Sequence, residues 1–130
     1  MRVMLSLPED DHDARAVAIL HDAVERGNTT LSRLRRAIIP ARIIRGVELM
    51  THDKSKASYA EYVVKLKPNR LARAVKLADL RDNANLHNVT FRVSKADKDK
   101  KRVIRYALSY KFLTDQITVG QFRELMRDAE

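Results

Sequence analysis

Residues 14–25 read ARAVAILHDAVE, and the spacing of their side chains decides the fold class. A group of five residues recurs at intervals of three and four, the period of one face of an α-helix: Ala14, Val17, Ala18, His21 and Val24. Gly27 and Asn28 follow, and both residue types tolerate positive φ, so the helix is predicted to end there. One polar side chain, His21, falls on the otherwise apolar face.

The same period continues through the rest of the chain. Thr30 is a predicted cap for a short helix carrying Leu31, Leu34 and Ile38, and residues 43–50 form another helix after Pro40. Ser58 with Glu61, and Thr118 with Gln121, have the capping-box spacing. Asn69 is predicted to cap a helix reaching about Leu86, and 95–113 reads as one long helix. Only 88–93 could be a strand. We therefore predict an all-α, single-domain helical bundle over 1–130, with helices of 95–129 at its C-terminal end.

Composition restricts the classes of function. The chain has 26 Lys and Arg against 17 Asp and Glu, a net charge of +9, which favours an anionic partner. Clusters occur at Arg33-Arg35-Arg36 and Lys98-Lys100-Lys101-Arg102, and each reads either as a solvated helix face or as a nucleic-acid contact. No cysteine is present, which excludes disulfides and thiolate chemistry. No signal peptide or bilayer-spanning stretch is expected, so we predict a cytoplasmic protein.

Two pairs of polar residues interrupt apolar faces. His21 and Glu25 are four residues apart, as are Asp79 and Asn83, so each pair shares a helix face. A carboxylate directed into a bundle core needs a cation, a donor or a metal to compensate its charge. Helical bundles build metal sites from His and carboxylates on different helices. The other reading is structural: a hydrogen-bonded core histidine, and Asp79 paired with Lys76 or Arg81.

Two blocks of the sequence carry a family resemblance. The first is Val17-Ala18-Ile19-Leu20-His21-Asp22-Ala23-Val24-Glu25 with Thr29, Thr30 and Leu31, and the second is Leu71-Ala72-Arg73-Ala74-Val75-Lys76-Leu77-Ala78-Asp79-Leu80-Arg81-Asp82-Asn83. Together, over about residues 10–90, they resemble HD-domain phosphohydrolases, above all the hydrolase domain of bifunctional stringent-response enzymes and their small single-domain relatives.

The resemblance implies an all-α fold of the HD type and a divalent ion, most often Mn²⁺. It assigns His21, Asp22 and Asp79 as metal ligands, Glu25 to the attacking water and Asn83 to ligand or substrate orientation. The implied reaction is that of a guanosine-3′,5′-bis(diphosphate) 3′-pyrophosphohydrolase, in which a metal-bound water attacks a phosphorylated guanosine nucleotide.

The sequence departs from the family pattern at two places, and these departures leave open whether the chain hydrolyses a nucleotide. The family's first metal-binding histidine lies about two dozen residues before the His-Asp pair, whereas only 20 residues precede His21 here, and Arg26 stands where the family has an acid. The alternatives are therefore a catalytically inactive HD-type module that binds a nucleotide, and a basic helical protein that binds nucleic acid. Binding of the second kind would weaken steeply with salt.

Overall fold

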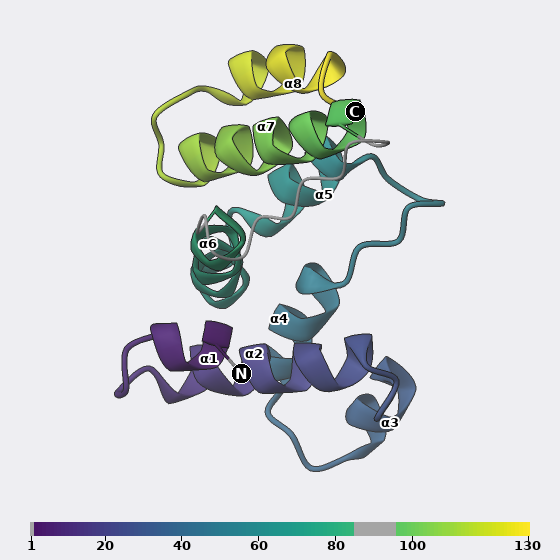
Figure 1. Cartoon of the computed structure of the whole chain (residues 1–130). Coiled ribbons are helices and arrows are strands. Elements are labelled where there is room, and N and C mark those ends of the chain that lie inside the picture. Colours follow the sequence, from purple (N-terminus) through teal and green to yellow (C-terminus); the bar gives the residue numbers. More distant parts are fainter. Residues whose placement is uncertain (1, 85–95) are drawn as a thin grey trace.

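Helix α6 is the central element of the computed structural model, which describes residues 2–84 and 96–130 (Figure 1). In chain order the helices are α1 (Arg2–Ser6), α2 (His12–Glu25), α3 (Leu31–Arg36), α4 (Ala41–Met50), α5 (Tyr59–Leu66), α6 (Arg70–Ala84), α7 (Ala96–Leu113) and α8 (Val119–Arg127). No strand occurs in these two ranges. The predicted all-α bundle is thus confirmed, and the strand considered for 88–93 lies outside the described residues.

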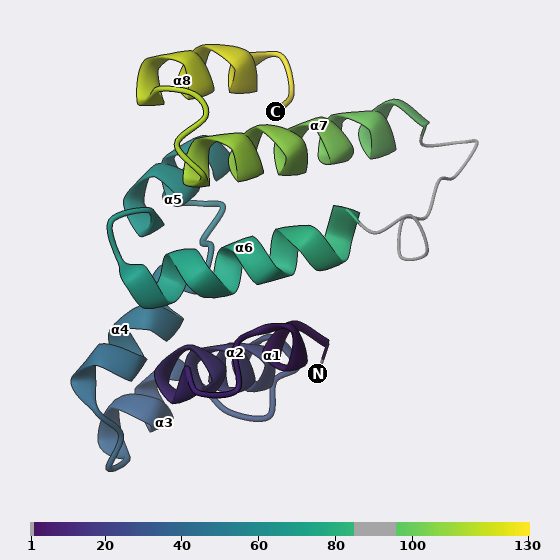
Figure 2. The ribbon, with the colours of Figure 1, turned by 90° about the vertical axis from the view of Figure 1, so that its left-hand side faces the viewer.

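The bundle has a layered arrangement about α6. Helices α1, α2 and α4 pack against α6 on one side and α7 packs against it on the other, with α8 beyond α7 (Figure 2). Fully buried side chains from six helices fill the interior: Val17, Val47, Val63, Leu66, Val75, Leu80, Leu113, Phe122 and Met126. No helix in the described part of the chain combines the length and apolar character needed to cross a membrane.

Local signals in the sequence account for several helix ends. Thr30 Oγ1 accepts from Arg33 N at 3.2 Å, and Asn69 Oδ1 accepts from Ala72 N at 3.0 Å. Gly27 has φ +76° just after α2, as its position predicts. Thr118 and Gln121 form both bonds of a capping box. Each of these interactions joins residues close in sequence, which is why the sequence could predict them.

Three local expectations were wrong or incomplete. Ile38 is fully exposed and lies beyond the end of α3 at Arg36, so it is not part of that helix's apolar face. Helix α1 was not predicted. The Ser58 side chain accepts a hydrogen bond from Glu61 N, which is one bond of the predicted capping box. The Glu61 carboxylate instead accepts a hydrogen bond from Arg123 Nε of α8 at 2.7 Å. That pairing spans 62 residues of sequence, so it could not be predicted from local spacing.

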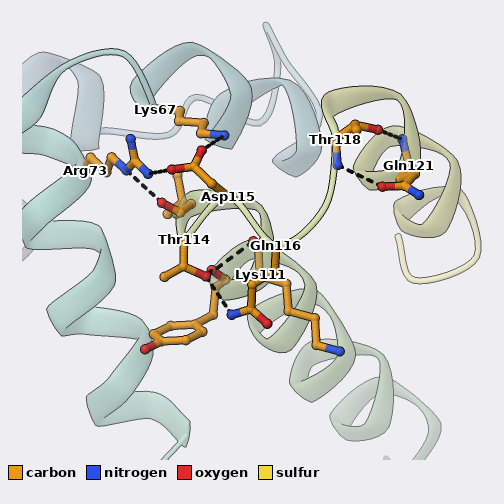
Figure 3. A network of polar contacts seen from close by, with 10 residues as sticks. Lys67, Arg73, Lys111, Thr114, Asp115, Gln116, Thr118 and Gln121 are labelled. Atoms are coloured by element: carbon orange, nitrogen blue, oxygen red, sulfur yellow. Dashed lines mark hydrogen bonds and ion pairs between the residues drawn. The ribbon is translucent and has the colours of Figure 1, made fainter.

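A polar network joins the start of α6 to the turn between α7 and α8 (Figure 3). Asp115, at φ 62°, accepts Lys67 Nζ at 2.8 Å on one oxygen and Arg73 at 2.8 Å on the other. The Arg73 Nε also donates to the Leu113 carbonyl at the end of α7, at 2.7 Å. These bonds fix α7 and α8 against the helices that carry the candidate site.

Candidate functional site

Three of the predicted site residues, His21, Glu25 and Asp79, line a cavity of about 320 Å³ between α2, α5 and α6. Its walls come from four helices and from the loop after α4, and comprise His21, Val24, Glu25, Met50, Thr51, His52, Tyr59, Tyr62, Lys76 and Asp79. The helical period explains the convergence, because His21 and Glu25 are one turn apart on α2, and Lys76 and Asp79 one turn apart on α6. Small-molecule sites begin at about this volume.

His21 is the buried titratable group of the α2 wall. Its side chain is 15% exposed, and its Nε2 lies 3.5 Å from Oε1 of Glu25, whose side chain is 64% exposed. Burial lowers the pKa of His21 more than the carboxylates of Glu25 and Asp79 raise it. The imidazole is therefore neutral at pH 7 and presents one donor and one acceptor nitrogen.

Lys76 supplies a buried charge to the α6 wall. Its side chain is 8% exposed, and its Nζ lies 3.4 Å from Oδ2 of Asp79. The same ammonium lies 5.3 and 5.2 Å from the ring centroids of Tyr59 and Tyr62, within cation–π range. Burial alone would lower the pKa of Lys76, but the oxygens of Tyr62, Tyr59 and Asp79 outweigh it and raise that pKa. Lys76 is therefore charged and compensates Asp79.

Aromatic rings and His52 form the third wall. The His52 ring stacks on Tyr62 with centroids 4.6 Å apart, and its Nε2 lies 2.9 Å from the Ala57 carbonyl oxygen. The Tyr62 hydroxyl donates to the Met50 carbonyl at 2.7 Å, and burial raises the pKa of Tyr62 to about 12. The Tyr59 hydroxyl is buried and has no hydrogen-bond partner among the residues described. The Tyr59 hydroxyl is thus enclosed in the cavity wall, where its oxygen contributes to the raised pKa of Lys76.

A second cavity of about 270 Å³ shares part of the third wall with the first. His52 and Tyr59 line both cavities, and the second is also lined by Lys54, Arg105 and Glu130. Lys54 and Arg105 thus lie next to the first cavity, in which Lys76 is paired with Asp79. A ligand with a neutral part and a phosphorylated part would match this division of charge.

The structure brings together only some of the residues predicted from sequence. His21, Glu25 and Asp79 line the same cavity. Asp22 does not line it, and its Oδ2 instead lies 3.1 Å from Nε of Arg26. Asn83 lies on α6 but is not among the residues lining the cavity. The structural reading of Asp79, a pair with Lys76, is confirmed.

The arrangement of these groups does not fit the implied Mn²⁺ ion. Within 2–84 and 96–130, no three His, Asp or Glu side chains are placed where they could hold a metal together. The donor types are suitable, since His and carboxylates bind such ions. However, Asp79 and Asp22 each face a fixed cation of this chain, Lys76 and Arg26.

Sequence reasoning did not assign Lys76, His52 or the two tyrosines to the cavity wall. Tyr59 and Tyr62 belong to α5, and His52 follows the end of α4 at Met50. One signal was available: Lys76 precedes Asp79 by three residues, a spacing at which helical side chains meet. The position of His52 depends on the loop between α4 and α5 and has no local signature.

No family model matches the chain, and no curated protein matches it.

Proposed function

We propose that this chain is a relative of the HD-domain phosphohydrolases that binds a phosphorylated guanosine nucleotide at the two adjoining cavities and does not turn it over. The observation that carries the proposal is the meeting of the two sequence blocks at one cavity, His21 and Glu25 from α2 opposite Lys76 and Asp79 from α6. These pairs lie more than fifty residues apart in the sequence, and chemically active side chains that converge on a cavity mark a candidate binding site.

The charges favour a division of the ligand between the two cavities. The Lys76–Asp79 pair and the neutral His21 balance the charge of the buried walls and leave the carboxylate of the exposed Glu25 uncompensated, so the buried part of the first cavity suits a nucleoside. Lys54 and Arg105 outnumber the carboxylate of Glu130 in the second cavity and suit phosphate groups, because ammonium and guanidinium bind phosphate oxygens through charge-assisted hydrogen bonds. The net charge of +9 would attract such a ligand over longer distances.

We propose that the nucleotide is not hydrolysed because of the surroundings of two carboxylates, Asp22 and Asp79. Hydrolysis of the implied kind needs a metal-bound water, and these two carboxylates face Arg26 and Lys76. Metal-dependent hydrolysis is the second candidate function. It is favoured by the fact that His21, Glu25 and Asp79 share one cavity and have suitable ligand chemistry.

Calorimetry with guanosine 3′,5′-bis(diphosphate), with and without Mn²⁺, tests the proposal, and chromatography of the same samples detects turnover. We expect binding without turnover. Lys54→Ala should weaken binding about three- to tenfold through a lost phosphate contact. Lys65→Ala, an exposed lysine of α5 that lines none of these cavities, is the matched control.

Two results would contradict the proposal. No nucleotide binding by the wild-type chain would remove it. Mn²⁺-dependent release of pyrophosphate that is lost in Asp79→Asn would establish the phosphohydrolase instead. The Asn variant is preferred to Ala because it keeps a polar group of the same shape beside Lys76.

Nucleic-acid binding has less support from the arrangement of the basic clusters. Arg33, Arg35 and Arg36 belong to α3, whereas Lys98, Lys100, Lys101 and Arg102 belong to the first half of α7. In Figure 2, α3 and the beginning of α7 lie at opposite corners of the molecule. Within α3, Arg35 is already paired with Glu48 at 3.2 Å. The two clusters therefore do not form one continuous basic surface.

A further inference from the structure

The connection between α3 and α4 exposes a run of apolar residues. Residues 37–41 read AIIPA, and four of these five side chains are exposed: Ala37, Ile38, Pro40 and Ala41. Ile38 is fully exposed, whereas its neighbour Ile39 packs against the core and holds the connection in place. Loops ordinarily carry polar residues, and a run of exposed apolar ones is a cost unless it serves an interaction. We call residues 37–41 the apolar tip.

Arginines flank the apolar tip on both sides. Residues 26–45 contain six arginines and no Lys, Asp or Glu, so this segment holds two thirds of the chain's net charge of +9. The arginines that belong to α3 and α4 are all exposed: Arg33, Arg35, Arg36, Arg42 and Arg45. Arginine is the cation best suited to phosphate, because its planar guanidinium donates two parallel hydrogen bonds.

The chain itself neutralises only part of this charge. Two carboxylates, those of Glu48 and Asp13, pair with three of the five arginines at 2.8–3.4 Å. Arg33 and Arg36 form no ion pair with any carboxylate in the described ranges, and Nε of Arg36 donates to the Ser32 carbonyl. Two guanidinium groups beside the apolar tip thus carry charge that an anionic partner can neutralise.

The apolar tip lies at one end of the molecule. In Figures 1 and 2 the ribbon that joins α3 to α4 forms the lower end, and α7 and α8 lie at the upper end. An extended surface can therefore approach the apolar tip and its arginines together.

An anionic lipid surface is the partner that matches both features. Arginines are attracted to the phosphates of the headgroups, while apolar side chains enter the boundary between headgroups and acyl chains. A nucleic-acid backbone matches the arginines alone. We propose that residues 33–45, which we call the α3–α4 corner, bind membranes that contain anionic lipids, with Ile38 inserted among the headgroups.

Cosedimentation with lipid vesicles tests the charged part of this proposal. We expect the chain to bind vesicles of phosphatidylcholine with phosphatidylserine, to ignore phosphatidylcholine alone, and to bind more weakly as salt is raised. Arg33→Gln with Arg36→Gln should weaken binding about fivefold for each arginine removed. Lys100→Gln with Lys101→Gln removes the same charge from exposed positions of α7, at the far end of the molecule, and should stay within about twofold of wild type.

A second pair of variants tests insertion. Ile38→Ser should weaken binding to the anionic vesicles about three- to tenfold, because a partly buried apolar side chain is lost. Ile104→Ser is the matched control, since Ile104 is an isoleucine of α7 that is 48% exposed, and it should bind as wild type. All the substituted side chains are exposed, and circular dichroism confirms that each variant keeps its helices.

Three results would overturn the proposal. The first is no binding of the wild-type chain to anionic vesicles, and the second is an equal loss in the arginine and lysine variants. The third is an Ile38→Ser variant that binds vesicles as wild type while duplex RNA competes for the arginines, which would assign the corner to nucleic acid. No residue of 26–45 lines either cavity of the candidate site, so the outcome is independent of the proposed function.

Discussion

The ammonium of Lys76 lies 3.4 Å from the carboxylate of Asp79, one turn further along α6, in the wall of the candidate site. Lys76 is 8% exposed and Asp79 33% exposed, so the lysine depends on this partner more than the aspartate does. The rings of Tyr59 and Tyr62 add a weaker attraction to the same ammonium. The pair therefore links the charge of the cavity to the stability of the bundle.

Asp79→Ala should lower the free energy of unfolding by about 1–3 kcal/mol. The removal of one partner leaves a buried charge uncompensated, which costs about 3–5 kcal/mol when both partners are buried, and the partial exposure of Asp79 reduces that cost. Urea unfolding followed by circular dichroism measures the change.

Lys76→Met in the Asp79→Ala background is the control for this prediction. It removes the orphaned ammonium and should restore part of the lost stability, since a methionine of similar length fills the same space. Equal stability of the single and double variants would show that the ammonium finds another partner and that the pair is not the cause.

The candidate site was predictable from sequence only where its residues lie within one helical turn of each other. His21 and Glu25 were identified in this way, and Asp79 was identified with Asn83. His21, Glu25 and Asp79 do share a cavity, but Asn83 does not line it. Asp22 and Arg26 are also four residues apart, so their ion pair could have been predicted from the sequence. What no local pattern contains is the order in which helices pack, and this order decides that Lys76 is buried and that His52 stacks on Tyr62.

Asp115 should make stability depend on pH in the acidic range. Hydrogen bonds from Lys67 and Arg73 lower the pKa of Asp115 in the folded chain below its usual value. A carboxyl with a lowered folded pKa stabilises the protein above its unfolded pKa, and this contribution is lost as the pH falls through the folded pKa. The melting temperature of the wild type should therefore exceed that of Asp115→Asn at pH 7.

The two melting temperatures should converge as the pH is lowered below about 4, the ordinary range of an aspartate. Asn is the suitable replacement because it also tolerates the positive φ of 62° at this position. A difference between the two proteins that stays constant from pH 7 to pH 3 would contradict the assignment, because an uncharged effect does not titrate.

Thr118→Ala should destabilise the chain by about 1 kcal/mol through the loss of the cap of α8. The Thr118 hydroxyl accepts from Gln121 N at 3.1 Å, and the Gln121 side chain accepts from Thr118 N at 2.9 Å. Thr118→Ser keeps the hydroxyl and should remain within a few tenths of a kcal/mol of wild type. Thermal unfolding distinguishes the two, and a Ser variant as unstable as Ala would assign the effect to the lost methyl group.

Gly46 and Gly120 give a matched pair in which the same substitution should have opposite signs. Both lie within helices, where Ala is favoured over Gly by about 1 kcal/mol. A Cβ on Gly46 would lie 2.8 Å from Cγ2 of Val17, a fully buried side chain of α2, whereas the nearest atom to a Cβ on Gly120 is 3.9 Å away. Val17 cannot move aside in a packed interior, so Gly46→Ala should separate α4 from α2 and lower the free energy of unfolding by about 1–3 kcal/mol.

Gly120→Ala has room for the added methyl group and should raise the free energy of unfolding by up to about 1 kcal/mol. Urea unfolding of both variants measures the two signs, and a stabilised Gly46→Ala would mean that α2 and α4 approach less closely than the structure shows.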